Sequence, residues 1–476
     1  MVFTDDMDDE NDVDQLEYQD AFDDEFIEEV IVPEDEVMDD EEGQDKNARV
    51  WRAGIDPIGE DEVLDYEPSA YTMYHKLRVE WPCLSMDILR DNLGNYRTKF
   101  PATLYAVTGS QADGVNKNKV SVLKISHLCR MKEEDLDEGV DLDGDSDDDD
   151  DEDPIVDARS FKHTGSINRI RAMPQKPNIV ATWADTGKVH MWNIEAHTRS
   201  LDAPNEPAPQ DIDPIFTFSG HSDEGYAMDW SSVHEGRFVS GGCDKNIFSY
   251  VMDQTGNFTV DTQPFSTHTA SVEDLQWSPT ERTVFASASV DGSIKIWDIR
   301  QPQHKHMLSL GAHNTDVNVI SWNKKVAYLL ASGGDDGSLK VWDLRNPTSP
   351  AALFEWHKKA ITSLQWHPHE DSVLVCSSED DSVTVWDMAL EADAEEVAKE
   401  STGASLSDYT VPPQLLFIHQ GQNHIKEVHF HPQVPSLMLS TAYDGIDIFK
   451  PANMDVLLPP AAPQASHAQQ DGITVD

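Results

Sequence analysis

The 476-residue chain carries 89 acidic and 35 basic residues, which gives a formal net charge of −54. This balance repels nucleic-acid phosphates and anionic lipid, so we expect basic protein partners and neither direct nucleic-acid binding nor membrane association. No apolar run approaches 18 residues and the first residues lack a basic, then apolar, leader, so the chain is expected to be soluble and intracellular. The four cysteines (Cys83, Cys129, Cys243 and Cys376) lie far apart, which predicts neither a disulfide framework nor a zinc site.

Two segments hold most of the negative charge. Residues 1–67 contain 28 acidic residues against three basic ones, and residues 133–153 contain 15 acidic residues and no base, so together they carry −40. Blocks of like charge stay solvated and cannot build a core. We therefore expect residues 1–67 to be a mostly disordered acidic segment and residues 133–153 to be an acidic loop. For the first segment, a role in solubility alone is the alternative.

Alternating apolar residues predict one four-stranded sheet around the acidic loop. Its strands are expected at 81–89, 103–110, 118–125 and 155–162, so the loop falls between the third and the fourth strand. Residues 70–77 precede this sheet. They are predicted either to form a strand that completes the last sheet of the chain or to form a short helix.

Six copies of one pattern follow, each running from a His to an aromatic residue that ends a strand. The period lies near 45 residues where no insertion intervenes, and the two longer intervals indicate insertions at 202–214 and 391–414. With Asp turns and strand alternation, this period predicts one four-stranded antiparallel blade per copy. The spacing is 29 residues in the first five copies and 30 in the last, which run over 163–192, 221–250, 268–297, 313–342, 357–386 and 419–449.

The pattern resembles the WD-repeat proteins, which implies an all-β, seven-bladed β-propeller over residues 68–450, followed by a disordered Pro/Ala/Gln-rich tail at 451–476. In that family a His, a turn Asp, a Ser or Thr and a Trp form a hydrogen-bonded chain that staples each blade. The residues that match these roles are His221, Asp244, His268, Asp291, Trp297, His313, Asp336, Trp342, His357, Asp380 and Trp386.

The repeated His–Asp–Ser set is interpreted as structural, because an enzyme needs one catalytic triad and not several. The chain also lacks a Gly-rich phosphate loop, and its close His pairs lack further ligands at metal spacing. We therefore expect no enzyme activity, no metal and no cofactor. Three departures from the pattern predict less tightly stapled blades: Thr186 stands in place of the turn Asp, and Tyr250 and Phe449 stand in place of Trp.

Two closer resemblances bear on function. EWPCLS (80–85) and PPQLLFIHQG (412–421) resemble segments of the histone-binding retinoblastoma-associated WD proteins, in which an acidic loop with a Pro pair grips a histone helix. This implies client-binding roles for Glu395, Glu396, Pro412 and Pro413, beside Glu391 and Asp393.

The closer match is to the glutamate-rich WD-repeat family. It covers roughly residues 55–450 and includes YHKL, PCLSMDILRDNLGNYRT and the internal acidic run. It implies a nuclear or nucleolar factor in large-subunit ribosome biogenesis that chaperones a basic ribosomal protein (of the L three type), with histone binding as the nearest alternative.

A dense acidic run can occupy the Lys and Arg residues of such a client until RNA displaces it. Selectivity would then come from apolar or aromatic anchors on the propeller. Phosphorylation of Ser146, within DSDDDDD, would add about −1.5 to −2 charges and tune the run without switching it. The acidic candidates for client contact are Asp145, Asp147, Asp148, Asp149, Asp150, Asp151, Glu152 and Asp153.

A different class of function is a substrate receptor of a cullin-four ubiquitin ligase. Arg300 and Arg345 end two WDxR sequences, a pattern that such receptors carry. The alternative is that both arginines form local salt bridges on the propeller rim.

Overall fold

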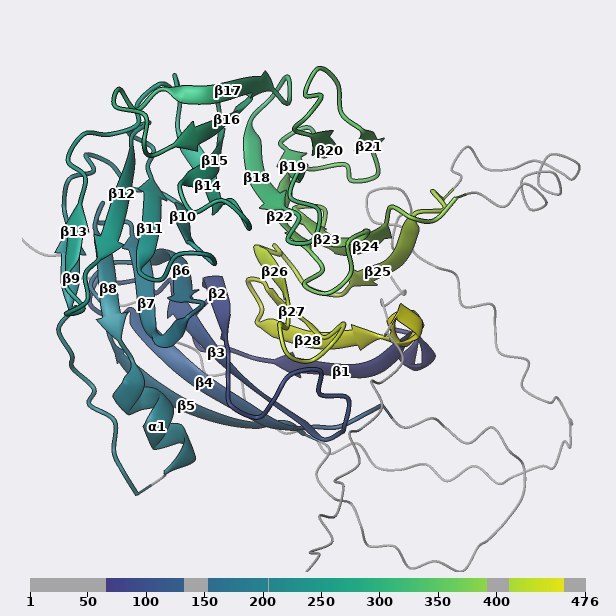
Figure 1. Cartoon of the computed structure of the whole chain (residues 1–476). Coiled ribbons are helices and arrows are strands. Elements are labelled where there is room, and N and C mark those ends of the chain that lie inside the picture. The colour runs from purple at the N-terminus through teal and green to yellow at the C-terminus, as the bar shows by residue number, and fades with distance from the viewer. Residues whose placement is uncertain (1–65, 132–152, 204, 392–410, 458–476) are drawn as a thin grey trace, which may run out of the picture. The chain divides into compact units, whose positions relative to one another are not determined.

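The computed structural model describes residues 66–131, 153–203, 205–391 and 411–457. Its strands form seven four-stranded antiparallel sheets, the blades, which are arranged in a ring (Figure 1). The innermost strands line a central cavity of about 180 Å³, here called the channel. The predicted all-β, seven-bladed propeller is therefore confirmed. The acidic segment before residue 66, most of the acidic loop, the centre of the 391–414 insertion and the tail beyond residue 457 lie outside the described residues.

In blades 1 to 6 the chain runs from the innermost strand, beside the channel, to the outermost strand at the rim. Blade 1 contains β2 (Cys83–Leu89), β3 (Ala102–Ser110), β4 (Lys119–Leu128) and β5 (Ile155–Lys162). Blade 2 contains β6 (Ile167–Met173), β7 (Lys176–Ala184), β8 (Val189–Asn193) and β9 (Phe216–Phe218). Blade 3 contains β10 (Ala227–Trp230), β11 (Arg237–Gly241), β12 (Ile247–Met252) and β13 (Phe258–Val260).

The remaining blades follow the same plan. Blade 4 contains β14 (Val272–Trp277), β15 (Val284–Ser289), β16 (Ser293–Asp298) and β17 (His306–Gly311). Blade 5 contains β18 (Val317–Trp322), β19 (Leu329–Gly334), β20 (Leu339–Asp343) and β21 (Ala352–Phe354). Blade 6 contains β22 (Ile361–Trp366), β23 (Val373–Ser378), β24 (Ser382–Asp387) and β25 (Leu415–Gln420). Blade 7 contains β26 (Glu427–Phe430), β27 (Met438–Thr441), β28 (Ile446–Pro451) and β1 (Tyr71–Leu77).

Blade 7 closes the ring by taking its outermost strand from the other end of the described chain. β1 pairs with β28, with Tyr74 opposite Phe449. The Tyr74 hydroxyl donates to the Asp447 carboxylate at 2.8 Å, and the Tyr71 hydroxyl lies 2.9 Å from His419 Nδ1. Of the two alternatives for residues 70–77, the strand is therefore right, and a 3-10 turn (Pro68–Ala70) directly precedes it. Closure leaves no open gap in the ring of blades.

The apolar core lies between neighbouring blades. Trp277 of blade 4, for example, packs in one cluster with Ala227 and Val239 of blade 3. A single four-stranded sheet cannot bury both faces, so each blade depends on its two neighbours. Truncation of such a buried aromatic side chain typically costs about 3–5 kcal/mol.

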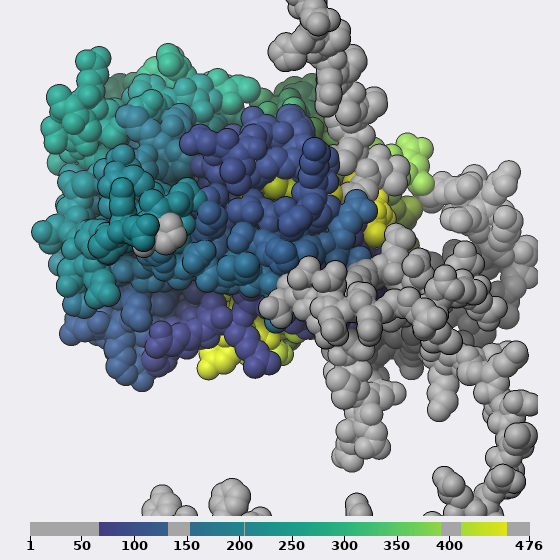
Figure 2. All heavy atoms as spheres, turned by 90° about the horizontal axis from the view of Figure 1, so that it is seen from below, coloured from purple at the N-terminus to yellow at the C-terminus, as the bar shows by residue number. Residues whose placement is uncertain are grey.

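The sequence did not predict the helix α1 (Glu195–Asp202), which lies against β4 and β5 on the outer side of blade 1 (Figures 1 and 2). The helix residues Leu201 and His197 are buried, and Arg159 of β5 donates to Ser200 Oγ at 2.8 Å. The helix has no side-chain N-cap and only two apolar residues, so it lacks the usual start signal and periodicity. Its stability comes from tertiary contacts.

The ordered part of the chain also extends beyond the expected boundary at residue 450. Residues Ala452–Leu457 form a 3-10 helix, η2, and Met454 is fully buried against the cluster that contains Tyr71 and Phe449. Among the described residues, no helix is long and apolar enough to cross a bilayer.

Candidate functional site

The predicted staple residues come together in blade 3. His221 Nδ1 lies 3.1 Å from Asp244 Oδ1, and His221 Nε2 lies 2.9 Å from Ser240 Oγ. The Tyr250 hydroxyl lies 2.8 Å from the same Ser240 oxygen. Burial alone would raise the pKa of Asp244, but the hydrogen bonds from His221 and the Ser222 N–H outweigh it and lower the pKa to about 2. The prediction of a looser blade at Tyr250 is wrong, because the phenol replaces the missing indole N–H.

Blades 4 and 5 contain the same arrangement. In blade 4, His268 Nδ1 lies 2.8 Å from Asp291 and His268 Nε2 2.6 Å from Ser287, to which Trp297 Nε1 donates at 2.8 Å. In blade 5 the corresponding residues are His313, Ser332, Trp342 and Asp336, with Ser338 bridging His313 and Asp336.

Blade 6 reaches the same result with a different hydroxyl. His357 lies 3.0 Å from Asp380 and 2.8 Å from Thr384, and Thr384 accepts the indole N–H of Trp386 at 2.8 Å. The His, the hydroxyl and the aromatic residue are buried in each of these four staples. A client or substrate therefore has no access to them, which fits the structural interpretation.

Blade 2 lacks one link of the staple, as the sequence indicates. His163 Nδ1 meets the carbonyl of Gly165 at 3.0 Å in place of a carboxylate, while His163 Nε2 and the Trp192 indole both meet Thr182. In blade 7, His419 stacks on Phe449 with ring centroids 4.0 Å apart.

A buried charge cluster joins blades 7, 1 and 2 at the channel. Glu427 of β26 is 2% exposed, and Arg169 Nη1 and Arg171 Nη2 donate to its Oε1 at 2.7 and 3.0 Å. Burial would raise the pKa of this carboxyl, but the two guanidinium groups hold it well below its usual range. The remaining partners of the carboxylate are Ser85 Oγ, the Met86 N–H and His429 Nε2.

The mouth of the channel at the starts of the innermost strands is rich in carboxylates. A cavity of about 380 Å³ there is lined by Glu273, Asp335 and Glu379, among others. Burial raises the pKa of Glu273, and burial followed by repulsion from Asp335 raises the pKa of Asp316. Several partly desolvated carboxylates thus face one another, and a bound cation would relieve their repulsion. Lys426 and Arg169 also line the cavity, where Lys426 is paired with Glu379 and Arg169 with Glu427.

Sequence analysis missed this channel mouth, although the repeat contained a signal for it. Glu224 and Asp316 each stand three residues after the repeat His, within three residues of the start of an innermost strand, and Glu273 lies five residues after the repeat His of its blade. Equivalent positions in successive blades converge on the channel axis, so acidic residues there become neighbours only when the ring closes.

Most of the predicted client-binding acids lie outside the described residues. These are Asp145, Asp147, Asp148, Asp149, Asp150, Asp151, Glu152, Glu395 and Glu396, together with the candidate phosphosite Ser146. Asp153 is described and exposed just before β5. Pro412 and Pro413 precede β25, where the Pro412 carbonyl accepts the Leu415 N–H at 2.9 Å. Their role in client binding stays a prediction.

The two WDxR arginines are held by the Asp of their own motif. Arg300 donates to both carboxylate oxygens of Asp298, and Arg345 does the same to Asp343. The Arg345 guanidinium also lies over the ring of Tyr328, 3.5 Å from its centroid. Local salt bridges thus form at both sites, while both side chains remain more than 60% exposed.

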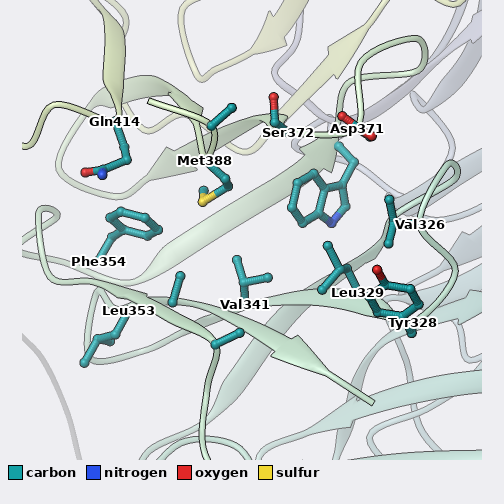
Figure 3. Close-up of a pocket in the computed structure, with 14 residues that line it drawn as sticks. Val326, Tyr328, Leu329, Val341, Leu353, Phe354, Asp371, Ser372, Met388 and Gln414 are labelled. Atoms are coloured by element: carbon teal, nitrogen blue, oxygen red, sulfur yellow. The ribbon is translucent and has the colours of Figure 1, made fainter. Parts of the chain in front are cut away.

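An apolar groove lies between blades 5 and 6 (Figure 3). Its volume is about 680 Å³, and its lining includes Trp366. Val341, Phe354 and Met388 face this space in Figure 3. Gln414, at the end of the 391–414 insertion, lies on one rim, and Tyr328 lies at the opposite end.

Seven four-stranded blades, four of which contain the complete staple of a His, a turn Asp, a hydroxyl and an aromatic residue, define a WD-repeat β-propeller. Within the described ranges, no group of His, Cys, Asp and Glu is able to hold a metal ion. The fold is similar to the WD40 β-propeller domain of Doa1, with a TM-score of 0.52 and 15% identity over 80% of this chain and 96% of that one. Residues 61–129 match the family described as histone-binding protein RBBP4 or a CAF1-complex component, and residues 232–427 match the nucleolar protein 10-like N-terminal domain.

Whole-chain relatives define the family more closely. The chain is 48% identical to glutamate-rich WD repeat-containing protein 1 of Dictyostelium discoideum (87% of each chain) and 42% identical to ribosome assembly protein rrb1 of Schizosaccharomyces pombe (92% and 93%). It is 46% identical to the Arabidopsis thaliana protein HEAT STRESS TOLERANT DWD 1 (87% and 94%). The chain belongs to this glutamate-rich WD-repeat family.

Proposed function

We propose that this protein is a non-enzymatic WD-repeat scaffold that chaperones a basic ribosomal protein of the large subunit, of the L three type, during ribosome biogenesis in the nucleus and nucleolus. The carboxylate-rich channel mouth carries this proposal. It supplies a fixed acidic surface on the propeller itself, in addition to the acidic segments. The similarity to ribosome assembly protein rrb1 supports the process.

The two kinds of acidic surface would act at different stages. The acidic loop 133–153 raises the rate of encounter with a cationic client, since long-range attraction steers diffusion at low salt. The channel mouth then holds particular Lys or Arg residues, because Glu273, Asp316 and Asp335 gain a counter-ion where they now repel one another. Ribosomal RNA, with its denser charge, displaces both contacts when the client is delivered.

The test is affinity purification of the tagged chain at two salt concentrations, followed by mass spectrometry. Three variants accompany the wild type: a deletion of 133–153, the double substitution Glu273→Gln with Asp335→Asn, and a control, Glu195→Gln with Asp213→Asn. The control removes the same number of charges from exposed positions away from the channel.

We expect one basic large-subunit ribosomal protein in near-equal amount with the wild type and the control. The deletion should weaken capture mainly at low salt, and the channel-mouth variant should weaken it at both concentrations. Loss of all binding at moderate salt in the wild type would refute a contribution from the propeller.

A second candidate function is histone chaperoning or chromatin adaptation. The match of residues 61–129 to a family described as histone-binding favours it. Competition between purified core histones and the ribosomal protein for this chain separates the two. Dominant capture of histones, with ribosomal proteins only at background, would replace the first proposal.

A receptor role in a cullin-four ligase is supported by the exposure of Arg300 and Arg345. Arg300→Ala is the cleaner test, because Arg345 also covers Tyr328 at the apolar groove. If Arg300→Ala pulls down the ligase adaptor as well as the wild type does, Arg300 has no receptor role and serves only its local salt bridge with Asp298.

A further inference from the structure

The groove between blades 5 and 6 has an apolar floor beneath a partly exposed rim. Trp366 and Val341 are 2% and 4% exposed at its base, while Leu353 on its rim is 47% exposed. The outermost strand of blade 5, β21, has only three residues, whereas β17 of blade 4 has six. Beside β21, the face between the two blades contains a cavity of about 680 Å³.

The walls of the groove are held in place by contacts that do not need a ligand. Gln414 Nε2 donates to the Leu390 carbonyl at 2.9 Å, and the Phe354 ring packs on Trp386 with centroids 4.6 Å apart. At the other end, the salt bridge of Arg345 to Asp343 fixes its guanidinium over Tyr328. A pocket that is already formed costs less ordering entropy on binding, which favours a specific anchor.

The charge around the groove is negative. Arg345 is neutralised by Asp343. Asp371 lines the groove and is exposed. Next to Asp371, burial and then the charge of Asp371 raise the pKa of Glu370, and this effect outweighs the opposite effect of Lys325. An apolar floor with an acidic rim suits a bulky apolar side chain that has Lys or Arg beside it in sequence.

We infer that this groove is the selective anchor for the client: a Lys/Arg-rich segment of the bound protein inserts one bulky aliphatic or aromatic side chain between blades 5 and 6. The inference rests on the proposed function, since the same basic client is captured by the acidic surfaces. The groove supplies the selectivity that the acidic surfaces lack, because carboxylates alone bind any cationic chain. A buried apolar anchor inside an acidic rim discriminates among basic proteins.

The first test uses two synthetic lysine-rich peptides that differ only in one Leu in place of Ser. Affinity is measured with the full-length protein at about 0.15 M and about 0.5 M salt, since surface charge pairs weaken as screening increases. We expect the Leu peptide to bind about ten-fold more tightly, with the ratio retained at the higher salt.

Ala351→Trp is the decisive variant, because Ala351 lines the groove and is exposed, so the indole fills the space without entering the core. It should abolish the preference for the Leu peptide and leave the Ser peptide unchanged. Met307→Trp is the matched control, since Met307 is 51% exposed on the outermost strand of blade 4, away from the groove. Leu353→Ser, at an exposed rim position, is a second variant should Ala351→Trp lower the melting temperature.

The outcomes separate this inference from the proposed function. Equal binding of both peptides, with binding reduced by deletion of 133–153, would overturn the anchor and leave the acidic chaperone intact. Failure of both peptides to bind would overturn both the anchor and the acidic chaperone. Concentration-dependent self-association of the protein that Ala351→Trp abolishes would show that a second copy occupies the groove, and would also overturn the anchor.

Discussion

At the residue scale, Glu427 is the position where one atom change should have the largest effect. Its carboxylate is the counter-ion of Arg169 and Arg171 in a buried site shared by three blades. Glu427→Gln leaves two guanidinium groups without their charge partner. We expect a loss of about 3–5 kcal/mol in the free energy of unfolding, measured by denaturant titration.

The same residue predicts a dependence on pH. The folded-state pKa of Glu427 is depressed, so its contribution is present above the unfolded value near 4.5 and is lost as pH falls toward the folded value. Wild-type stability should therefore decline below about pH 4.5 more steeply than that of the Gln variant. Glu379→Gln is the control, because Glu379 is half exposed and lies 3.8 Å from Lys426. An equal loss in both variants would contradict the role of Glu427.

Blade 2 offers a gain of stability. Thr186 stands where four other blades have the staple Asp, 23 residues after the repeat His. Thr186→Asp should give His163 Nδ1 a carboxylate partner in place of the Gly165 carbonyl, as in the Asp244 staple. We expect stabilisation of about 1 kcal/mol, seen as a higher melting temperature. A lower melting temperature would show that the blade-2 turn cannot adopt the Asp geometry.

At the element scale, β1 determines whether the ring closes. A chain that starts at residue 66 keeps β1, and we expect it to melt close to the wild type. A chain that starts at residue 78 loses the strand that pairs with β28 and the hydroxyls that contact His419 and Asp447. It should be destabilised by several kcal/mol and aggregate through the exposed β28 edge, as size-exclusion chromatography would show. Equal melting of the two truncated chains would contradict this role of β1.

The elements also show where sequence patterns sufficed and where they did not. Strands of 7 to 10 residues with clear alternation, such as those of blade 1, could be placed from the sequence to within about three residues. The helix α1 could not, because its polar sequence becomes helical only through contacts such as Arg159 with Ser200. Tyr250 was misjudged for a related reason: whether a phenol can replace an indole depends on the distance to Ser240.

At the scale of the whole molecule, much of the negative charge lies in segments between or before the predicted blades, such as residues 133–153. This distribution predicts how fast a basic client associates. Deletion of 133–153 removes 15 carboxylates that are not needed for the blades. The association rate with a basic client should fall about ten-fold or more at low salt, while the dissociation rate changes little. Stopped-flow measurements over a range of salt concentrations would show the difference shrinking as the Debye length shortens. A change confined to the dissociation rate would contradict steering by the loop.

The sequence by itself determined the blade count, the staples and the positions of the acidic segments. Each of these is encoded locally, as a fixed spacing or as a block of like charge. Only the tertiary structure decided which residues from different blades meet. Glu273, Asp335 and Glu379 line one channel mouth, Glu427 pairs with Arg169, which lies 258 positions earlier in the chain, and Trp366 and Phe354 line one groove. These sites exist because closure of the ring brings residues of separate repeats into contact. No local sequence pattern states which residues of different blades will meet.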